Sequence, residues 1–191
     1  MLILDARRKA ISNIVSALDF DVFLPKRLFK GAWNNFLFFP SDHIFTEEFA
    51  EVVAELLNIE NAHVCCFLNI NETNSLVFEN IAAIFLDKTI TGREFDAALR
   101  GNGPSVGWIY RVDSYVCASD IGEWCIYCER ENDIAVIGFR SDCGNRKFRL
   151  PMEKLLARPI TELVTLEGAS IFPFNKLTPD WRSELTKNFD N

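Results

Sequence analysis

The stretch that decides the fold class runs Gly122-Glu-Trp-Cys-Ile-Tyr-Cys-Glu129, and it is followed by Arg130-Glu-Asn-Asp133 and then Ile134-Ala-Val-Ile137. The first and third segments are rich in aromatic and β-favouring residues, and the polar segment between them is short. Two such runs around a short polar connection are typical of a β-hairpin. The sequence therefore predicts two adjacent antiparallel strands here, within a sheet that is mainly antiparallel in this region.

The first strand of this hairpin would have two different faces, because successive side chains in a strand point in opposite directions. Trp124 and Ile126 share one face. Glu123, Tyr127 and Glu129 share the other. If one face packs in the core, the other is left to carry a tyrosine anchor with an acidic rim for a partner protein, and we expect this arrangement.

Six cysteines occur in the chain, and Cys125 and Cys128 stand in a Cys-x-x-Cys spacing. That spacing is found in zinc knuckles and in redox sites. In a strand, however, residues three apart point to opposite faces, so these two thiols are not placed to share a metal or to form a disulfide. The same geometry separates Cys65 from Cys66, and the chain has only two histidines. We expect reduced, structural cysteines, no metal site and no cofactor.

Hydrophobic periodicity predicts the remaining helices and strands. Apolar spacing and helix-start signals predict helices at 5–18, 46–60, 91–101 and 151–156, and a last one from 178. Apolar β-prone runs predict strands at 35–39, 63–68, 76–78, 108–112 and 115–117, and an edge strand at 147–150. The run 81–86 fits either a strand or a buried helix. The expected fold class is α+β: residues 1–191 form a single domain in which helices flank a mainly antiparallel sheet.

Three of the predicted helices begin at a threonine. Thr46 can cap the helix that follows it, since a threonine hydroxyl accepts a hydrogen bond from a first-turn N–H. Thr91 and Glu94 have the spacing of a capping box. Thr178 precedes Pro179, which suits the first position of a helix because proline has no N–H to leave unsatisfied. We expect all three threonines to act as N-caps.

Composition excludes several classes of protein. With 191 residues, 49% of them hydrophobic and 13% aromatic, the chain can bury a substantial core. No run reaches the ~18–20 apolar residues of a membrane span, and residues 1–9 place their charges after the apolar residues, unlike a signal peptide. A net charge of −7 disfavours binding to phosphate backbones or anionic lipids. We expect a cytoplasmic protein that binds neither nucleic acid nor membranes.

The negative charge is concentrated in one part of the sequence. Residues 31–87 contain no lysine or arginine and nine acidic residues, so this segment carries −9. The rest of the chain contains the other 18 of the 27 acidic residues and all 20 basic residues, so it carries +2. The nine acidic residues are Asp42, Glu47, Glu48, Glu51, Glu55, Glu60, Glu72, Glu79 and Asp87.

Glu47, Glu51 and Glu55 follow one another at four-residue spacing and would form an exposed ridge on the predicted helix. Like charges at this spacing destabilise a helix by about 0.2–0.5 kcal/mol per pair. The ridge is either a solvated face that keeps the protein soluble or a docking surface for a basic partner. With the hairpin, the predicted partner-binding residues are Asp42, Glu47, Glu48, Glu51, Glu55, Glu60, Glu123, Tyr127 and Glu129.

Two stretches carry a resemblance to a known group of proteins. They are Asn35-Phe-Leu-Phe-Phe-Pro-Ser-Asp42, which leads into the acidic helix, and the aromatic hairpin from Gly122 to Ile137. Together they resemble the small, acidic, cytosolic immunity proteins that bacteria carry beside polymorphic or contact-dependent growth-inhibition toxins. The resemblance implies tight, non-catalytic binding to a toxin, often a basic nuclease, and it assigns no role to any single residue. The oligomeric state stays open.

Motifs for catalysis are weak. The run from Gly101 to Gly107 has the glycines of a phosphate-binding loop, but it follows a predicted helix and precedes a strand, the reverse of such loops. Ser41-Asp42-His43 has the residue types of a hydrolase triad, but three consecutive side chains cannot form its chain of hydrogen bonds. An enzyme or small-ligand protein with a dispersed site, using Asp42, His43 and a cysteine, stays as the alternative. A structural adaptor is the third hypothesis.

Overall fold

The fold is built on one antiparallel sheet. The computed structural model describes residues 2–70, 83–103, 107–110, 113–141, 144–164 and 171–190. In this part of the chain six strands pair antiparallel in the order β1-β6-β5-β4-β2-β3. They are β1 (Asn35–Pro40), β2 (Val64–Asn69), β3 (Ala83–Asp87), β4 (Ser114–Ser119), β5 (Trp124–Glu129) and β6 (Ile134–Phe139). The expected α+β class, a mainly antiparallel sheet flanked by helices, is confirmed.

The predicted hairpin is confirmed as β5 and β6. Trp124 lies opposite Phe139 at one end of the pair, and Glu129 lies opposite Ile134 at the other. On its second side β5 pairs with β4, where Glu129 lies opposite Ser114. β5 is therefore a central strand with neighbours on both edges.

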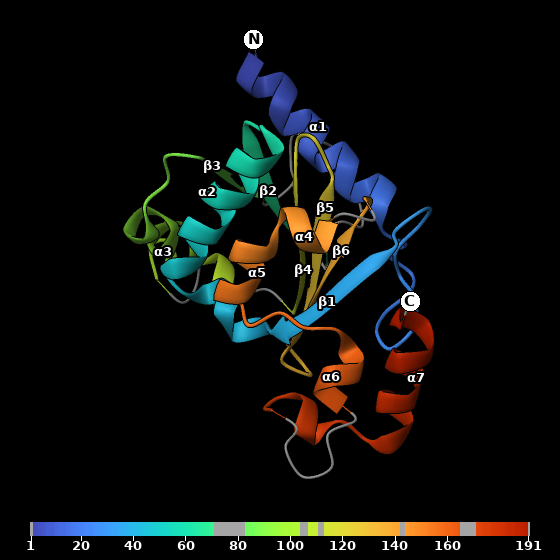
Figure 1. The fold of residues 1–191 in the computed structure, drawn as a ribbon. Helices are drawn as coiled ribbons and strands as arrows, with labels where there is room; N and C mark the ends of the chain where they lie inside the picture. The colour runs from blue at the N-terminus through green and yellow to red at the C-terminus, as the bar shows by residue number, and fades with distance from the viewer. Residues whose placement is uncertain are drawn as a thin grey trace.

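Helices cover both faces of the sheet (Figure 1). One face, here called the α1 face, is covered by α1 (Leu2–Ala17), α6 (Ile160–Val164), the 3-10 turn η3 (Phe174–Lys176) and α7 (Pro179–Phe189). The other, the α2 face, is covered by α2 (Glu48–Glu60), α3 (Gly92–Arg100), α4 (Gly144–Lys147) and α5 (Arg149–Lys154), with the 3-10 turns η1 (Ser41–Phe45) and η2 (Trp108–Tyr110). Strand side chains are therefore buried on both faces.

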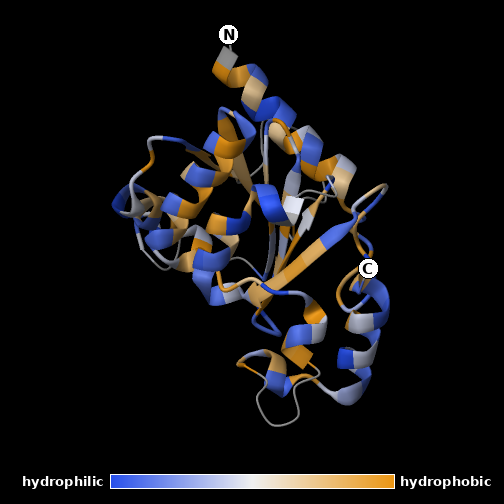
Figure 2. Ribbon diagram, viewed as in Figure 1, coloured by the Kyte–Doolittle hydropathy of each residue, from blue (hydrophilic) through white to orange (hydrophobic). Residues whose placement is uncertain are grey.

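The core of the α2 face is aromatic. Phe67 on β2 is fully buried, and its ring centre lies 5.6 Å from that of Phe49 on α2 and 5.7 Å from that of Phe95 on α3. Tyr115 and Trp108 extend the cluster, at 6.4 Å and 6.2 Å from Phe67. Figure 2 shows apolar and polar bands alternating along α2, as an amphipathic helix on a sheet requires. Packing of this stripe fixes α2 on the sheet.

Residues 147–150 do not form the predicted edge strand. Lys147 ends α4, and Arg149 and Leu150 begin α5, because Phe148 between the two helices is drawn into the core and stacks on Phe139 at 5.3 Å between ring centres. Gly144 begins α4. A Cβ at Gly144 would lie 2.4 Å from the Cβ of Phe139, so only glycine fits there without a shift of the chain. The edge of β6 is occupied by β1 instead.

Two further strand predictions have different outcomes. The prediction at 108–112 is wrong in its described part, because Trp108–Tyr110 form the turn η2. Gly107 allows this turn, since a Cβ there would lie 2.3 Å from the carbonyl oxygen of Arg100. Of the ambiguous run 81–86, the described residues belong to strand β3. The predicted strand at 76–78 lies outside the described residues.

Two of the three predicted caps are confirmed. The Thr91 hydroxyl accepts from the Glu94 N–H, and the Glu94 carboxylate accepts from the Thr91 N–H, which completes the capping box of α3. The Thr178 hydroxyl accepts from Trp181 at the start of α7. Thr46 does not cap α2: its hydroxyl donates to the carbonyl of His43 at 3.0 Å and so closes η1.

Candidate functional site

The exposed acids of α2 lie beside a lysine that the sequence places far away. The Lys154 ammonium on α5 is 2.5 Å from Glu55 Oε1 and 3.8 Å from Glu51 Oε2. Hydrogen bonding and charge from Glu55 raise the pKa of Lys154. Part of the predicted ridge is therefore neutralised within the protein.

Three predicted binding residues at the start of α2 remain exposed without an ion pair in the described part of the chain. They are Asp42 on η1, and Glu47 and Glu48 where α2 begins. Gly92 brings the first turn of α3 against Glu47, since a Cβ on Gly92 would lie 2.6 Å from the Cβ of Glu47. The positive end of the α3 dipole favours acidic side chains nearby. We call Asp42, Glu47, Glu48, Glu51 and Glu55 the α2 acidic surface.

Glu60 is a structural residue, which corrects its prediction as a partner-binding one. Its side chain is 7% exposed, and Oε1 accepts a 2.6 Å hydrogen bond from the N–H of Glu123. Burial raises the pKa of Glu60, and hydrogen bonds from Ser119 and the Glu123 N–H oppose the rise. Glu123 forms an ion pair with Lys147. Both acids therefore hold the β4–β5 connection against α2 and α4.

Tyr127 cannot be the exposed anchor that the alternation of the hairpin suggests. The pattern distinguishes two faces correctly, but helices cover both, and Tyr127 is 1% exposed in the core of the α1 face. Burial raises its pKa, and the Glu129 carboxylate raises it further, whereas Ser114 opposes the rise. In the described residues, the buried hydroxyl forms no hydrogen bond of normal geometry.

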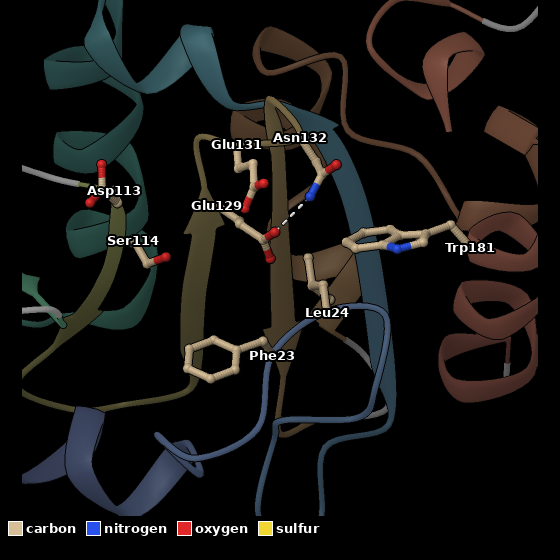
Figure 3. Close-up of a pocket in the computed structure, with 8 residues that line it drawn as sticks. All are labelled: Phe23, Leu24, Asp113, Ser114, Glu129, Glu131, Asn132 and Trp181. Carbon is tan, nitrogen blue, oxygen red and sulfur yellow. Dashed lines mark hydrogen bonds between the residues drawn. The ribbon is translucent and has the colours of Figure 1, made fainter. Parts of the chain in front are cut away.

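Glu129 lines a cavity of about 480 Å³ where β4 begins and β5 ends (Figure 3). Figure 3 shows the Trp181 side chain entering from α7, Phe23 and Leu24 coming from the connection after α1, and the Glu129 carboxyl above Leu24 in this view. We call it the Glu129 cavity. Its lining residues are Phe23, Leu24, Asp113, Ser114, Glu129, Glu131, Asn132 and Trp181.

The Glu129 carboxyl has one oxygen bonded and one without a partner. Oε1 accepts a 2.6 Å hydrogen bond from Nδ2 of Asn132. Oε2 is buried and makes no hydrogen bond in the described part of the chain. Burial raises the pKa of Glu129, the Asn132 hydrogen bond opposes the rise, and Glu131 adds to it. A buried oxygen without a partner is costly, because most buried polar atoms in folded proteins are hydrogen-bonded.

The two histidines each line a cavity but have structural contacts. His43 Nδ1 lies 3.0 Å from the carbonyl oxygen of Leu155, beside a cavity of about 210 Å³. His63 Nδ1 lies 3.2 Å from Asp120 Oδ2, beside a cavity of about 260 Å³. Asp120 Oδ1 also accepts from the N–H groups of His63 and Val64. Both imidazoles therefore hold connections in place.

The dispersed site of the enzyme hypothesis is not assembled in the described residues. Asp42 does not line the cavity beside His43, and no described cysteine lines either histidine cavity. Cys125 faces the α1 side and Cys128 the α2 side, as the strand geometry predicts. The described cysteines form no disulfide, although Cys65 and Cys117 lie 3.1 Å apart between their sulfurs. Among the described residues, no group of three or more His, Cys, Asp or Glu could hold a metal ion.

Most of the Glu129 cavity is missing from the predicted site. Phe23, Ser114 and Trp181 come from distant parts of the sequence, and only the sheet and α7 bring them together. No short motif joins them, so no local pattern could have indicated this site. Of the residues that line the cavity, the sequence predicts only Glu129 as a binding residue. It predicts Glu129 as part of an exposed acidic rim, not as the lining of a cavity.

Comparisons with known proteins give no further guide. No family model, no curated protein and no solved structure significantly matches the chain. In the described residues, no helix combines the length and the apolar character needed to cross a bilayer. The function is therefore inferred from the geometry of this protein.

Proposed function

We propose that the protein is a non-catalytic inhibitor of the immunity type, which binds a basic protein toxin in the cytoplasm. The observation that carries the proposal is the α2 acidic surface. Five carboxylates gather there, and Lys154 is the cation paired with them in the described residues. Five negative charges less one positive charge leave −4 for this set of six side chains.

The arrangement suits fast, selective association with a cation-rich protein. Glu47, Glu51 and Glu55 repel one another along the helix, and Lys154 relieves the repulsion at the last two only. A basic partner would relieve it at Asp42, Glu47 and Glu48. Exposed charges of one sign speed encounter with an opposite charge by long-range attraction, which salt screens over about 10 Å at 0.1 M. The binding step needs no catalytic residue.

The test neutralises the exposed end of the surface. The variant is Asp42→Asn with Glu47→Gln and Glu48→Gln, and the bait is the full chain in extract from the native host. We expect the unmodified chain to capture a basic protein, identified by mass spectrometry, and the variant to associate with that purified protein at least tenfold more slowly at 50 mM salt. At 500 mM salt the two rates should converge, because the attraction is then screened.

A matched control removes three exposed acids from the other side of the sheet: Glu162→Gln, Asp180→Asn and Glu184→Gln. This variant has the same net charge as the first, so it should associate nearly as fast as the unmodified chain. Expression of the captured protein should stop bacterial growth, and co-expression of the unmodified chain should restore it. Equal slowing by both triple variants, or a captured protein without toxicity, would contradict the proposal.

A further inference from the structure

The Glu129 cavity has the features of a site for one organic cation. Its volume of about 480 Å³ lies within the ~300–1,000 Å³ that ligand pockets usually have. Three of its eight lining residues are acidic, and no lysine or arginine lines it. It lies on the α1 side of the sheet, whereas the α2 acidic surface lies on the other.

One buried polar atom of the cavity lining has no partner in the described residues. Glu129 Oε2 is buried and makes no hydrogen bond in the described residues. Buried polar atoms are normally hydrogen-bonded, so this oxygen is consistent with a donor that is supplied from outside the chain. Asn132 uses its Nδ2 on Glu129 Oε1, which leaves its own carbonyl oxygen as an acceptor.

The cavity also offers aromatic surface. Phe23 is a large apolar residue that is 51% exposed, and Trp181 is half-buried with its indole at the cavity. Aromatic faces attract cations, tryptophan most strongly, and they stack well on planar ones. Carboxyl and amide oxygens beside aromatic faces therefore suit a cation that is both flat and rich in N–H donors.

We infer that the Glu129 cavity binds an alkylguanidinium group, either the side chain of an arginine on another protein or a free guanidine compound. A guanidinium has five N–H donors in one plane, which matches the spread of acceptors on Glu129, Asn132 and Ser114 and leaves its face for Trp181. A compact ammonium has three donors and no flat face. A metal ion is disfavoured, because the carboxyls are too dispersed to form a cluster of three.

The test measures binding of defined probes to the full chain by calorimetry and by NMR shifts of the tryptophan indole N–H groups. The probes are N-acetyl-arginine methylamide, methylguanidinium, N-acetyl-lysine methylamide, and the neutral isostere N-acetyl-citrulline methylamide. We expect the arginine probe to bind at least tenfold tighter than the lysine and citrulline probes. Methylguanidinium binding more tightly than the arginine probe would assign the site to a free compound, and the reverse order would assign it to an arginine side chain.

Two variants locate the binding. Glu129→Gln should weaken the arginine probe at least tenfold, and Trp181→Leu should weaken it several-fold, while Glu162→Gln, outside the cavity, should not change it. The urea midpoint of each variant checks that it is folded. Citrulline binding as tightly as arginine, or a folded Glu129→Gln that binds normally, would overturn the inference. The neutralised α2 variant should bind the probe normally, so failure of the proposed function and failure of this site give different results.

Discussion

Glu60 offers a sharp test of the distinction between structural and exposed acids. Its carboxyl lies between α2 and the β4–β5 connection, where Oε1 accepts from the Glu123 N–H at 2.6 Å and Oε2 makes no hydrogen bond of normal geometry in the described residues. Glu60→Ala removes the acceptor and leaves that N–H without its partner. Glu60→Gln keeps an oxygen acceptor and removes the titrating charge.

The magnitudes follow from these contacts. Loss of a partner for a buried donor costs about 1–3 kcal/mol, and the Glu123 N–H is partly buried, so Glu60→Ala should lower the free energy of unfolding by about 1 kcal/mol. Burial raises the pKa of Glu60, so its neutral form is favoured in the folded state. This contribution is fully present below the unfolded pKa of about 4.3 and is lost as pH rises through the raised folded pKa. Glu60→Gln has no such loss, so its stability relative to the unmodified chain should increase with pH.

Urea unfolding at pH 4.5 and pH 8 provides the measurement. We expect the free energy of unfolding of Glu60→Gln, relative to that of the unmodified chain, to be higher at pH 8 than at pH 4.5. We expect Glu60→Ala to be the least stable of the three proteins at pH 4.5. Burial also raises the pKa of Glu129. Because both proteins keep Glu129, the difference between Glu60→Gln and the unmodified chain reports on Glu60 alone. A Gln variant that loses stability relative to the unmodified chain as pH rises would refute the reasoning, and so would an Ala variant with unchanged stability.

Three other substitutions have defined outcomes. Thr91→Ala removes the hydroxyl that accepts from Glu94 and should cost about 0.5–2 kcal/mol in urea unfolding, whereas Thr91→Ser should restore most of it. Phe67→Ala empties the centre of the aromatic core and should cost about 3–5 kcal/mol by the same assay; a cost below 1 kcal/mol would contradict the packing. Lys154→Met breaks the surface pair with Glu55 and should change stability by less than about 1 kcal/mol, yet it should speed association with a basic protein at low salt.

The sequence predicts those parts of the fold in which a local pattern and the tertiary structure agree. The β5–β6 hairpin has both strands and the connection within one continuous stretch, and the capping box of α3 lies within four residues. The edge strand predicted at 147–150 is wrong, because this stretch can form either a strand or short helical turns. Packing of Phe148 on Phe139 favours the helical turns. Strand order could not be predicted, since β1 pairs with β6 across almost a hundred residues.

The site is predicted less well than the fold. A sequence shows which residues are charged, but it does not show which of them form ion pairs in the folded protein. Glu55 and Lys154 are 99 positions apart, and only the packing of α5 beside α2 brings them together. The alternation of β5 distinguishes its faces correctly, but it does not show that helices cover both, so Tyr127 is buried. Glu72 and Glu79 of the acidic segment lie outside the described residues.

The α2 acidic surface and the Glu129 cavity differ in exposure, so binding at the two sites should depend differently on salt concentration. The α2 acidic surface is exposed, so its attraction acts over about a Debye length and is strongly weakened between 50 and 500 mM salt. The Glu129 cavity acts through a buried oxygen and aromatic contacts, whose short range makes them far less sensitive to salt. A partner that uses both would lose association rate in high salt while keeping most of its resistance to dissociation. A partner that uses only α2 would lose association rate in high salt, and lysine and arginine in its binding surface would contribute similarly to the long-range attraction.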